Sequence, residues 1–108
     1  MELVFEWNRE KEKINFQKHG ITFNEAKTVF YDPLSRIFDD FIHSVGESRE
    51  IIIGHSITKK LLLVIYVERK QNVIRIISAR QATKKEKKDY EKNKNKFWIK
   101  GFWNVERI

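Results

Sequence analysis

Arginines end two apolar segments of this 108-residue chain, and arginine is well suited to chemistry on phosphate. Arg69 follows the run Leu61–Val67, and Arg80 follows the segment Val73–Ala79. A guanidinium group stays charged and donates two parallel hydrogen bonds to a phosphate, so it can stabilise charge that develops on phosphorus. Arg69 and Arg80 are therefore candidate catalytic residues. The structural alternative is that they are solvated strand ends that discourage aggregation.

These two segments predict a β-hairpin, because the short polar stretch Lys70–Asn72 separates them. In a hairpin Arg69 and Arg80 lie at opposite ends of the paired strands, so the sequence leaves open whether they share a site. Regular alternation points Arg75 and Arg80 to opposite faces, unless a bulge intervenes. Arg75 and Arg49 are further candidates for binding phosphate.

His19 is a candidate for proton transfer, since the unperturbed pKa of imidazole lies near neutrality. It follows Lys18, a candidate phosphate ligand, and precedes Gly20. An equally weighted alternative is that protonated His19 stabilises the C-terminal end of a helix. His43 and His55 have no carboxylate partner at metal-ligand spacing, and the chain has no cysteine, no H-E-x-x-H motif and no glycine-rich phosphate loop. The sequence therefore predicts neither a metal nor a cofactor.

A formal net charge of +7 favours a polyanionic partner, which could be nucleic acid, an anionic membrane surface or an acidic protein. The alternative is that the charge only maintains solubility. Residues 84–100 hold much of it, with eight lysines against three acidic residues. Lys84, Lys85 and Lys88 are predicted phosphate contacts, which act through counterion release and carry no sequence preference.

An aromatic cluster closes the chain, and it consists of Phe97, Trp98, Phe102 and Trp103. Such side chains stack on unpaired bases, fold back onto a sheet or dock against a partner protein. Residues 1–95 are predicted to form a single domain, and residues 96–108 a basic and aromatic tail. No segment has the roughly 20 apolar residues of a membrane span, and no signal peptide is evident, so we expect a cytoplasmic protein without a membrane partner.

Local signals predict the helices that must position these residues. A first helix, Arg9–His19, has Asn8 as its N-cap and Gly20 as its left-handed stop. A second helix begins at the T-x-x-E capping box of Thr22 and Glu25. This helix is expected to end at Asp32-Pro33. A similar box, which begins at Thr83, opens a third helix that extends to about residue 94.

The predicted fold class is α+β, with an antiparallel sheet of about four to five strands, two N-terminal helices and one C-terminal helix. Leu61–Val67 is uniformly apolar, which is typical of a central strand covered on both faces. The expected strands are Glu2–Trp7, Ser35–Phe38, Ser48–Gly54, Leu61–Val67 and Val73–Ala79.

A series of motifs across residues 1–91 closely resembles the BrnT toxins, the ribonuclease half of a bacterial type II toxin–antitoxin pair. The K-H-G segment and the I-R-I-I-S-A-R segment at this separation are together the most specific part. The matching segments are Phe5–Trp7, Asn15–Phe23, Glu25–Ala26, Val29–Pro33, Gly46–Arg49, Leu62–Arg69, Ile74–Thr83 and Glu86–Tyr90.

The resemblance implies a RelE-like fold and an endoribonuclease that inhibits translation. It also implies a ribbon-helix-helix antitoxin of the BrnA type, which neutralises the toxin and binds operator DNA with it. The implied functional positions are Arg69 and Arg80, with weaker candidates at Lys18, His19, Glu47, Arg49 and Arg75.

RNA cleavage without a metal uses the neighbouring 2′-hydroxyl as the nucleophile, so the enzyme must remove a proton and stabilise charge on phosphorus. The base could be His19 or a lysine whose pKa is lowered by neighbouring positive charge. The alternative function is a non-catalytic basic module that binds RNA or an antitoxin, and a protein scaffold is a third possibility.

Overall fold

A five-stranded sheet in the order β1-β5-β4-β3-β2 forms the centre of the structure. The computed structural model describes residues 2–40, 44 and 46–92. Its elements along the chain are β1 (Val4–Glu6), α1 (Arg9–His19), α2 (Phe23–Ala26), the 3-10 helix η1 (Lys27–Tyr31), β2 (Arg36–Asp39), β3 (Glu50–His55), β4 (Leu61–Lys70), β5 (Val73–Gln81) and α3 (Lys84–Lys92).

The sheet is mostly antiparallel, which confirms the predicted fold class, but it includes one parallel pair. Strands β2 to β5 pair antiparallel, as predicted, whereas β1 pairs parallel with β5. The Val4 N–H donates to the carbonyl oxygen of Asn72 at 2.7 Å, at the start of this pairing. The first strand thus lies beside the last, a long-range pairing that no turn signal in the sequence announces.

Helix α1 has the predicted limits. The Asn8 side chain accepts a hydrogen bond from the Lys11 N–H, and Gly20 adopts a φ of 73° while its N–H donates to Phe16. A non-glycine residue would be strained at that φ. Both signals were local in the sequence, so both could be predicted.

Buried Asn15 fastens α1 to the sheet. Its Nδ2 donates to the carbonyl oxygens of Ala79, at 2.9 Å, and Ile21, at 3.2 Å. Its Oδ1 accepts from the Ala79 N–H at 3.0 Å. Since α1 carries little apolar surface, these bonds fix the helix end beside β5.

The second predicted helix is divided into α2 and η1. Thr22 accepts from the Glu25 N–H, as a capping box requires, but the Glu25 carboxylate bonds the hydroxyls of Ser56 and Thr58 instead of returning to the cap. The predicted box is therefore only half formed. Its glutamate instead ties α2 to the turn after β3.

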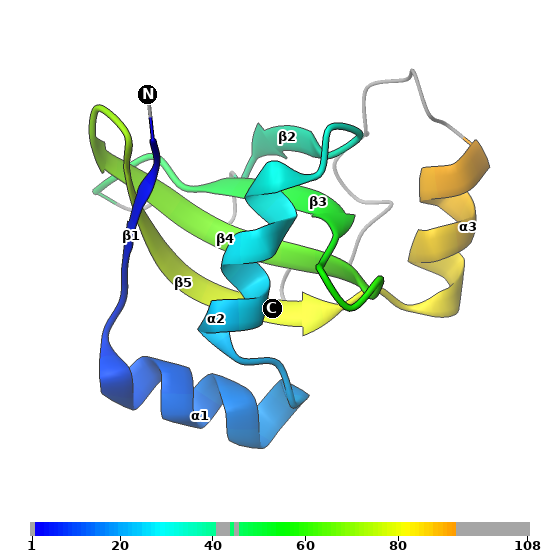
Figure 1. The fold of residues 1–108 in the computed structure, drawn as a ribbon, viewed down its shortest axis with the longest axis horizontal. Helices are drawn as coiled ribbons and strands as arrows, with labels where there is room; N and C mark the ends of the chain where they lie inside the picture. The colour runs from blue at the N-terminus through cyan, green and yellow to red at the C-terminus, as the bar shows by residue number, and fades with distance from the viewer. Residues whose placement is uncertain (1, 41–43, 45, 93–108) are drawn as a thin grey trace.

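The helices cover the sheet unequally (Figure 1). Helix α2 and η1 pack on one face through a core that includes Phe23, Val29 and Leu62. On the opposite face, Tyr90 of α3 packs on a second core that includes Ile53 and Leu63. Residues 61–67 are all buried, which confirms the prediction that this strand is central and covered on both faces.

Helix α3 begins at the predicted capping box, and here both bonds are made. Thr83 N–H donates to Glu86 Oε1 at 2.9 Å, and Glu86 N–H donates to Thr83 Oγ1 at 3.1 Å. The helix is described to Lys92; its expected end near residue 94 and the predicted tail 96–108 lie outside the described residues. Among the helices that the structure describes, none is long and apolar enough to cross a membrane.

Candidate functional site

Three of the candidate arginines lie at the same end of the sheet, near the hairpin that joins β4 to β5. Val67 of β4 pairs with Arg75 of β5. On the other side of β4, Glu50 pairs with Tyr66, so the same register places Arg49 beside Val67. Neighbouring strands are about 4.8 Å apart, which puts the backbones of Arg49 and Arg75 roughly 10 Å from each other.

Arg69 lies at the same end of the sheet, and we call the three residues Arg49, Arg69 and Arg75 the arginine cluster. It occupies an irregularity in β4 between Glu68 and Lys70, two residues beyond Val67. A bulge of this kind re-aims side chains at the edge of a paired segment. Arg69 is exposed and Arg75 is half-buried, so solvent reaches both.

Glu47 is the carboxylate that pairs with Arg49 of the cluster. Its Oε2 lies 3.6 Å from Arg49 Nε, and its side chain is 40% exposed, against 24% for Arg49. Glu6 of β1 lies in register with Arg75, so two carboxylates accompany the three guanidinium groups and a smaller positive excess remains. The cluster therefore offers both a site for phosphate and an adjacent proton acceptor.

Acidic side chains gather on the opposite face at the same end of the sheet. Tyr66 lies in the core under α2, and burial raises the pKa of its hydroxyl, as do the nearby charges of Glu50, Glu68 and Asp39. Since side chains alternate along a strand, Arg49 and Arg75 point away from this acidic group. Positive charge at this end of the sheet is therefore concentrated on the arginine face, although Glu6 lies there beside Arg75.

Arg80 lies at the other end of the sheet from Arg69. It pairs with Leu63, which precedes Arg69 by six residues, so the backbones of the two arginines are about 20 Å apart. The question left open by the sequence is thereby answered: Arg69 and Arg80 cannot act on one phosphate. The pairing of β4 with β5 also shifts register between Ile65 and Tyr66. Because of this shift, Arg75 and Arg80 lie on the same face of the sheet, whereas regular alternation predicted opposite faces.

Arg80 is also buried, with 6% of the residue exposed, and it is paired with Glu86. Its Nη1 and Nη2 donate to the two carboxylate oxygens at 2.7 and 2.8 Å. Burial alone would raise the pKa of Glu86, but bonds from Arg80 and Thr83, together with the Arg80 charge, hold it below the ordinary value. Arg80 is thus neither the solvated strand end of the structural alternative nor an open phosphate ligand.

His19 lies near Arg80 at the end of α1. Burial lowers the pKa of the imidazole, and the charges of Lys18 and Arg80 lower it further. A lowered pKa disfavours the cationic form of His19, which argues against the interpretation that it stabilises the helix end as a cation. Its Nε2 is buried and makes no hydrogen bond to any described residue.

The predicted lysines are distributed around this same end of the structure. Lys18 is exposed at the end of α1, and Lys84, Lys85 and Lys88 are exposed on α3. Because α3 follows β5 directly, these lysines lie near Arg80 rather than at the arginine cluster. They can add long-range attraction for a polyanion but do not complete the cluster.

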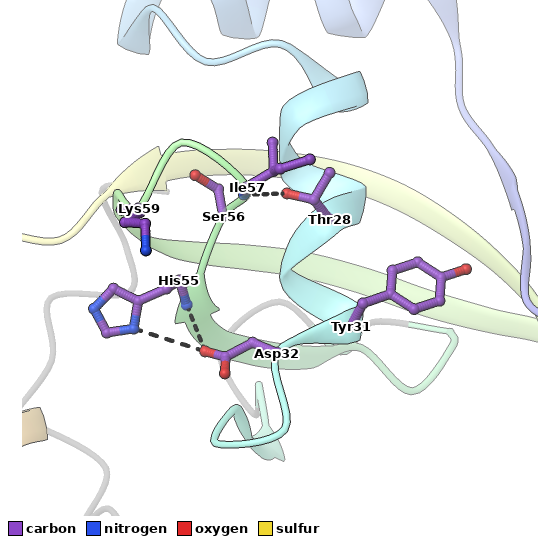
Figure 2. A pocket seen from close by; sticks show the side chains of 7 residues that line it. All are labelled: Thr28, Tyr31, Asp32, His55, Ser56, Ile57 and Lys59. Carbon is purple, nitrogen blue, oxygen red and sulfur yellow. Dashed lines mark hydrogen bonds and ion pairs between the residues drawn. The ribbon is translucent and has the colours of Figure 1, made fainter.

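The structure also reveals a hollow that the sequence did not predict. It has a volume of about 700 Å³ and lies between η1 and the turn that follows β3 (Figure 2). Its lining consists of Thr28, Tyr31, Asp32, His55, Ser56, Ile57 and Lys59. In the sequence His55 has no carboxylate partner at metal-ligand spacing. Its partner in the structure, Asp32, is 23 residues away in the chain.

Asp32 orients His55 in this hollow. Asp32 Oδ2 accepts from the backbone N–H of His55 at 2.7 Å and lies 3.7 Å from the imidazole Nδ1, while Oδ1 accepts from the backbone N–H of Leu34 at 2.9 Å. Gly54 allows this approach, because a Cβ there would lie 3.0 Å from Asp32 Oδ2 and 2.9 Å from Ser35 Cβ. Gly54 was the available sequence signal, since a glycine inside a strand often marks close packing.

Within the described ranges 2–40, 44 and 46–92, no group of three or more His, Cys, Asp or Glu residues is arranged to hold a metal ion. The charged groups that could contact phosphate are guanidinium and ammonium groups. The fold and the arginine cluster together define a small basic α+β protein with three arginines at one end of its sheet.

The chain belongs to the family described as "Ribonuclease toxin, BrnT, of type II toxin-antitoxin system", which it matches over residues 7–86. This confirms the resemblance seen in the sequence. The crystal structure of the Brucella abortus ribonuclease toxin BrnT has the same fold, with a TM-score of 0.58 and 21% sequence identity over 78% of this chain and 99% of that chain. No curated protein matches the sequence.

Proposed function

We propose that this member of the ribonuclease toxin family is a metal-independent endoribonuclease that inhibits translation by cleaving RNA at the arginine cluster. The observation that carries the proposal is the position of Arg49, Arg69 and Arg75 at one end of the sheet, just before β3 and on the adjacent strands β4 and β5. Guanidinium groups supply the fixed positive charge that a phosphoryl transition state requires. The family description supports RNA as the substrate.

The proposed reaction is an attack of the 2′-hydroxyl on the neighbouring phosphorus. The O2′–P bond forms, the P–O5′ bond breaks, and the products are a 2′,3′-cyclic phosphate and a 5′-hydroxyl end. Arg69 and Arg75 hold the phosphate oxygens and stabilise the added charge. The leaving 5′-oxygen takes a proton from solvent.

We assign the base to Glu47 in place of His19. Glu47 is exposed and lies 3.6 Å from Arg49 Nε, so its carboxylate can accept the 2′-hydroxyl proton beside the bound phosphate. His19 and Arg80 lie at the far end of β5, and we propose that they support the structure there. Lys18, Lys84, Lys85 and Lys88 attract RNA without taking part in the chemistry.

The type II family implies an antitoxin partner. We propose that this partner is a ribbon-helix-helix protein of the BrnA type, that it covers the arginine cluster in the cytoplasm, and that the complex binds operator DNA. We also propose that residues 1–95 form the toxin domain and residues 96–108 a separate tail. A polyanion-binding face is suited to an acidic protein surface as well as to RNA.

Purified protein incubated with RNA and excess EDTA tests the proposed chemistry. We expect cleavage that leaves 2′,3′-cyclic phosphate ends, no cleavage of the same sequence made of DNA, and a large loss of rate in Glu47→Gln with unchanged RNA binding. Glu91→Gln, an exposed glutamate on α3, is the matched control. Cleavage that EDTA abolishes contradicts the mechanism, and salt-dependent RNA binding without cleavage favours a non-catalytic binding module.

A further inference from the structure

The hollow beside His55 has features that the proposed chemistry at the arginine cluster does not use. It lies at the end of β3 opposite Arg49, six residues and about 20 Å away along the strand. Its volume of about 700 Å³ lies within the range of small-ligand sites, roughly 300–1,000 Å³. Its lining combines an aromatic ring, an aliphatic side chain, a cation and an oriented imidazole.

Two large apolar side chains are exposed at this hollow although the segments that carry them are held firmly. Tyr31 is 64% exposed and Ile57 is 76% exposed. The Tyr31 ring packs edge-on against Phe5, with centroids 6.3 Å apart. The Ile57 N–H donates to Thr28 Oγ1 at 2.9 Å, a bond that is drawn in Figure 2.

The turn after β3 is also preorganised. Glu25 accepts from the hydroxyls of Ser56 and Thr58, and the Lys59 N–H donates to the Ser56 carbonyl. Lys59 itself adopts a φ of 66°, which is uncommon for a residue with a side chain. Such a turn presents Ile57 and Lys59 in a fixed arrangement, and fixed groups lose little entropy when a ligand binds.

One side of the hollow carries groups that can contact a phosphate, and the other side does not. His55 and Lys59 lie on one side in Figure 2, and Tyr31 lies on the other. Asp32 would repel an anion, but its carboxylate is only 12% exposed and is directed to His55 and to the Leu34 amide. The exposed groups are therefore a cation and an imidazole opposite an aromatic ring.

We propose that this hollow is a nucleotide-binding subsite for RNA, distinct from the arginine cluster. A base stacks on the exposed face of Tyr31 beside Ile57, and its phosphate contacts Lys59 and His55. Stacking on an aromatic side chain and neutralisation of phosphate by a nearby cation are the two means by which proteins hold single-stranded nucleic acid. This inference rests on the proposed function only in taking RNA as the ligand.

An oligonucleotide that cannot be cleaved separates binding from catalysis. The full chain, labelled with ¹⁵N, is titrated with a mixed-sequence single-stranded oligodeoxynucleotide, which lacks the 2′-hydroxyl. We expect amide shifts at His55, Ile57 and Lys59, and binding that is about 5- to 100-fold weaker in Tyr31→Ala. Phe16→Ala, which removes a half-exposed ring from α1, serves as the control and leaves affinity unchanged.

The salt dependence gives a second readout that does not depend on the packing of Tyr31. Lys59→Gln reduces the slope of log K against log salt by about 0.7, the value for one phosphate contact on a single strand, whereas Lys13→Gln on α1 leaves it unchanged. Equal affinity of Tyr31→Ala and Phe16→Ala, or amide shifts confined to the arginine cluster, overturns the subsite. RNA cleavage by the same variants is measured in parallel. Cleavage without binding at the hollow refutes the subsite alone. Binding at the hollow without cleavage refutes only the proposed catalysis.

Discussion

Removal of the Glu86 carboxylate should strongly destabilise the protein. Glu86 and Arg80 have side chains that are 4% and 7% exposed, and two bonds of 2.7 and 2.8 Å join them. Glu86→Ala removes the carboxylate that pairs with the buried guanidinium group, and breaking such a pair costs about 3–5 kcal/mol. The variant also loses the Glu86 bond that caps the first turn of α3 through the Thr83 amide.

The pH dependence of stability follows from the same pair. The pKa of Glu86 is lower in the folded chain than in the unfolded chain, because Arg80 and Thr83 outweigh the effect of burial. The stabilising contribution is therefore complete above the unfolded value of about 4.5 and is lost as pH falls through the folded pKa. Glu86→Gln should remove this part of the acid dependence.

Urea unfolding followed by circular dichroism measures both effects. Glu91→Ala is the matched control, since Glu91 is exposed on the same helix, and its free energy of unfolding should change by less than about 0.5 kcal/mol. The double variant Arg80→Met/Glu86→Leu should recover much of the stability, because an apolar pair leaves no buried charge. If Glu86→Ala costs less than about 1 kcal/mol, the structural role assigned to Arg80 is refuted.

Three further changes test other parts of the structure by urea unfolding. Asn15→Ala leaves the polar groups of Ala79 without side-chain partners and should cost about 1–3 kcal/mol, whereas an effect as small as that of exposed Gln17→Ala contradicts the clamp. Gly54→Ala should cost about 1–3 kcal/mol through overpacking against Ser35, and an unchanged midpoint argues against the close approach. The free energy of unfolding should fall as pH drops below about 6.5, because the pKa of His19 is lowered only in the folded chain and the unfolded chain therefore binds the proton more readily. His19→Gln should reduce this dependence of stability on pH if the imidazole is responsible.

The parts of the fold that depend on local signals could be predicted from the sequence. Asn8 and Gly20 set the limits of α1, and Thr83 with Glu86 begins α3, because each signal acts within four residues of its helix end. The parallel pairing of β1 with β5 could not be predicted in this way. It joins residues about 70 positions apart, and no turn between them fixes the direction.

The site was harder to predict because its geometry depends on register. The types of residue in the arginine cluster indicated phosphate binding, but only the strand pairing shows that Arg49 and Arg75 flank Val67. The irregularity between Ile65 and Tyr66 reverses the expected face of Arg80, and a single extra residue of this kind has no clear sequence signal.

Partners across the fold were missed for a related reason. Glu86 was expected only to cap α3, and its pairing with buried Arg80 was not anticipated. His55 was dismissed because its carboxylate partner, Asp32, belongs to another element. Both pairs depend on how α3 and η1 pack against the sheet, which the sequence pattern does not specify.

The rate of RNA cleavage by Arg75→Ala, compared with Arg9→Ala in the presence of EDTA, tests the central claim most directly. Both variants lose one positive charge, but Arg9 is exposed on α1 and lies outside the cluster. Removal of one preorganised donor to a transition-state oxyanion lowers the rate about 10²–10³-fold, so we predict a loss of this size for Arg75→Ala and a rate near that of the unchanged protein for Arg9→Ala. Equal rates for the two folded variants would contradict the assignment of cleavage to the arginine cluster.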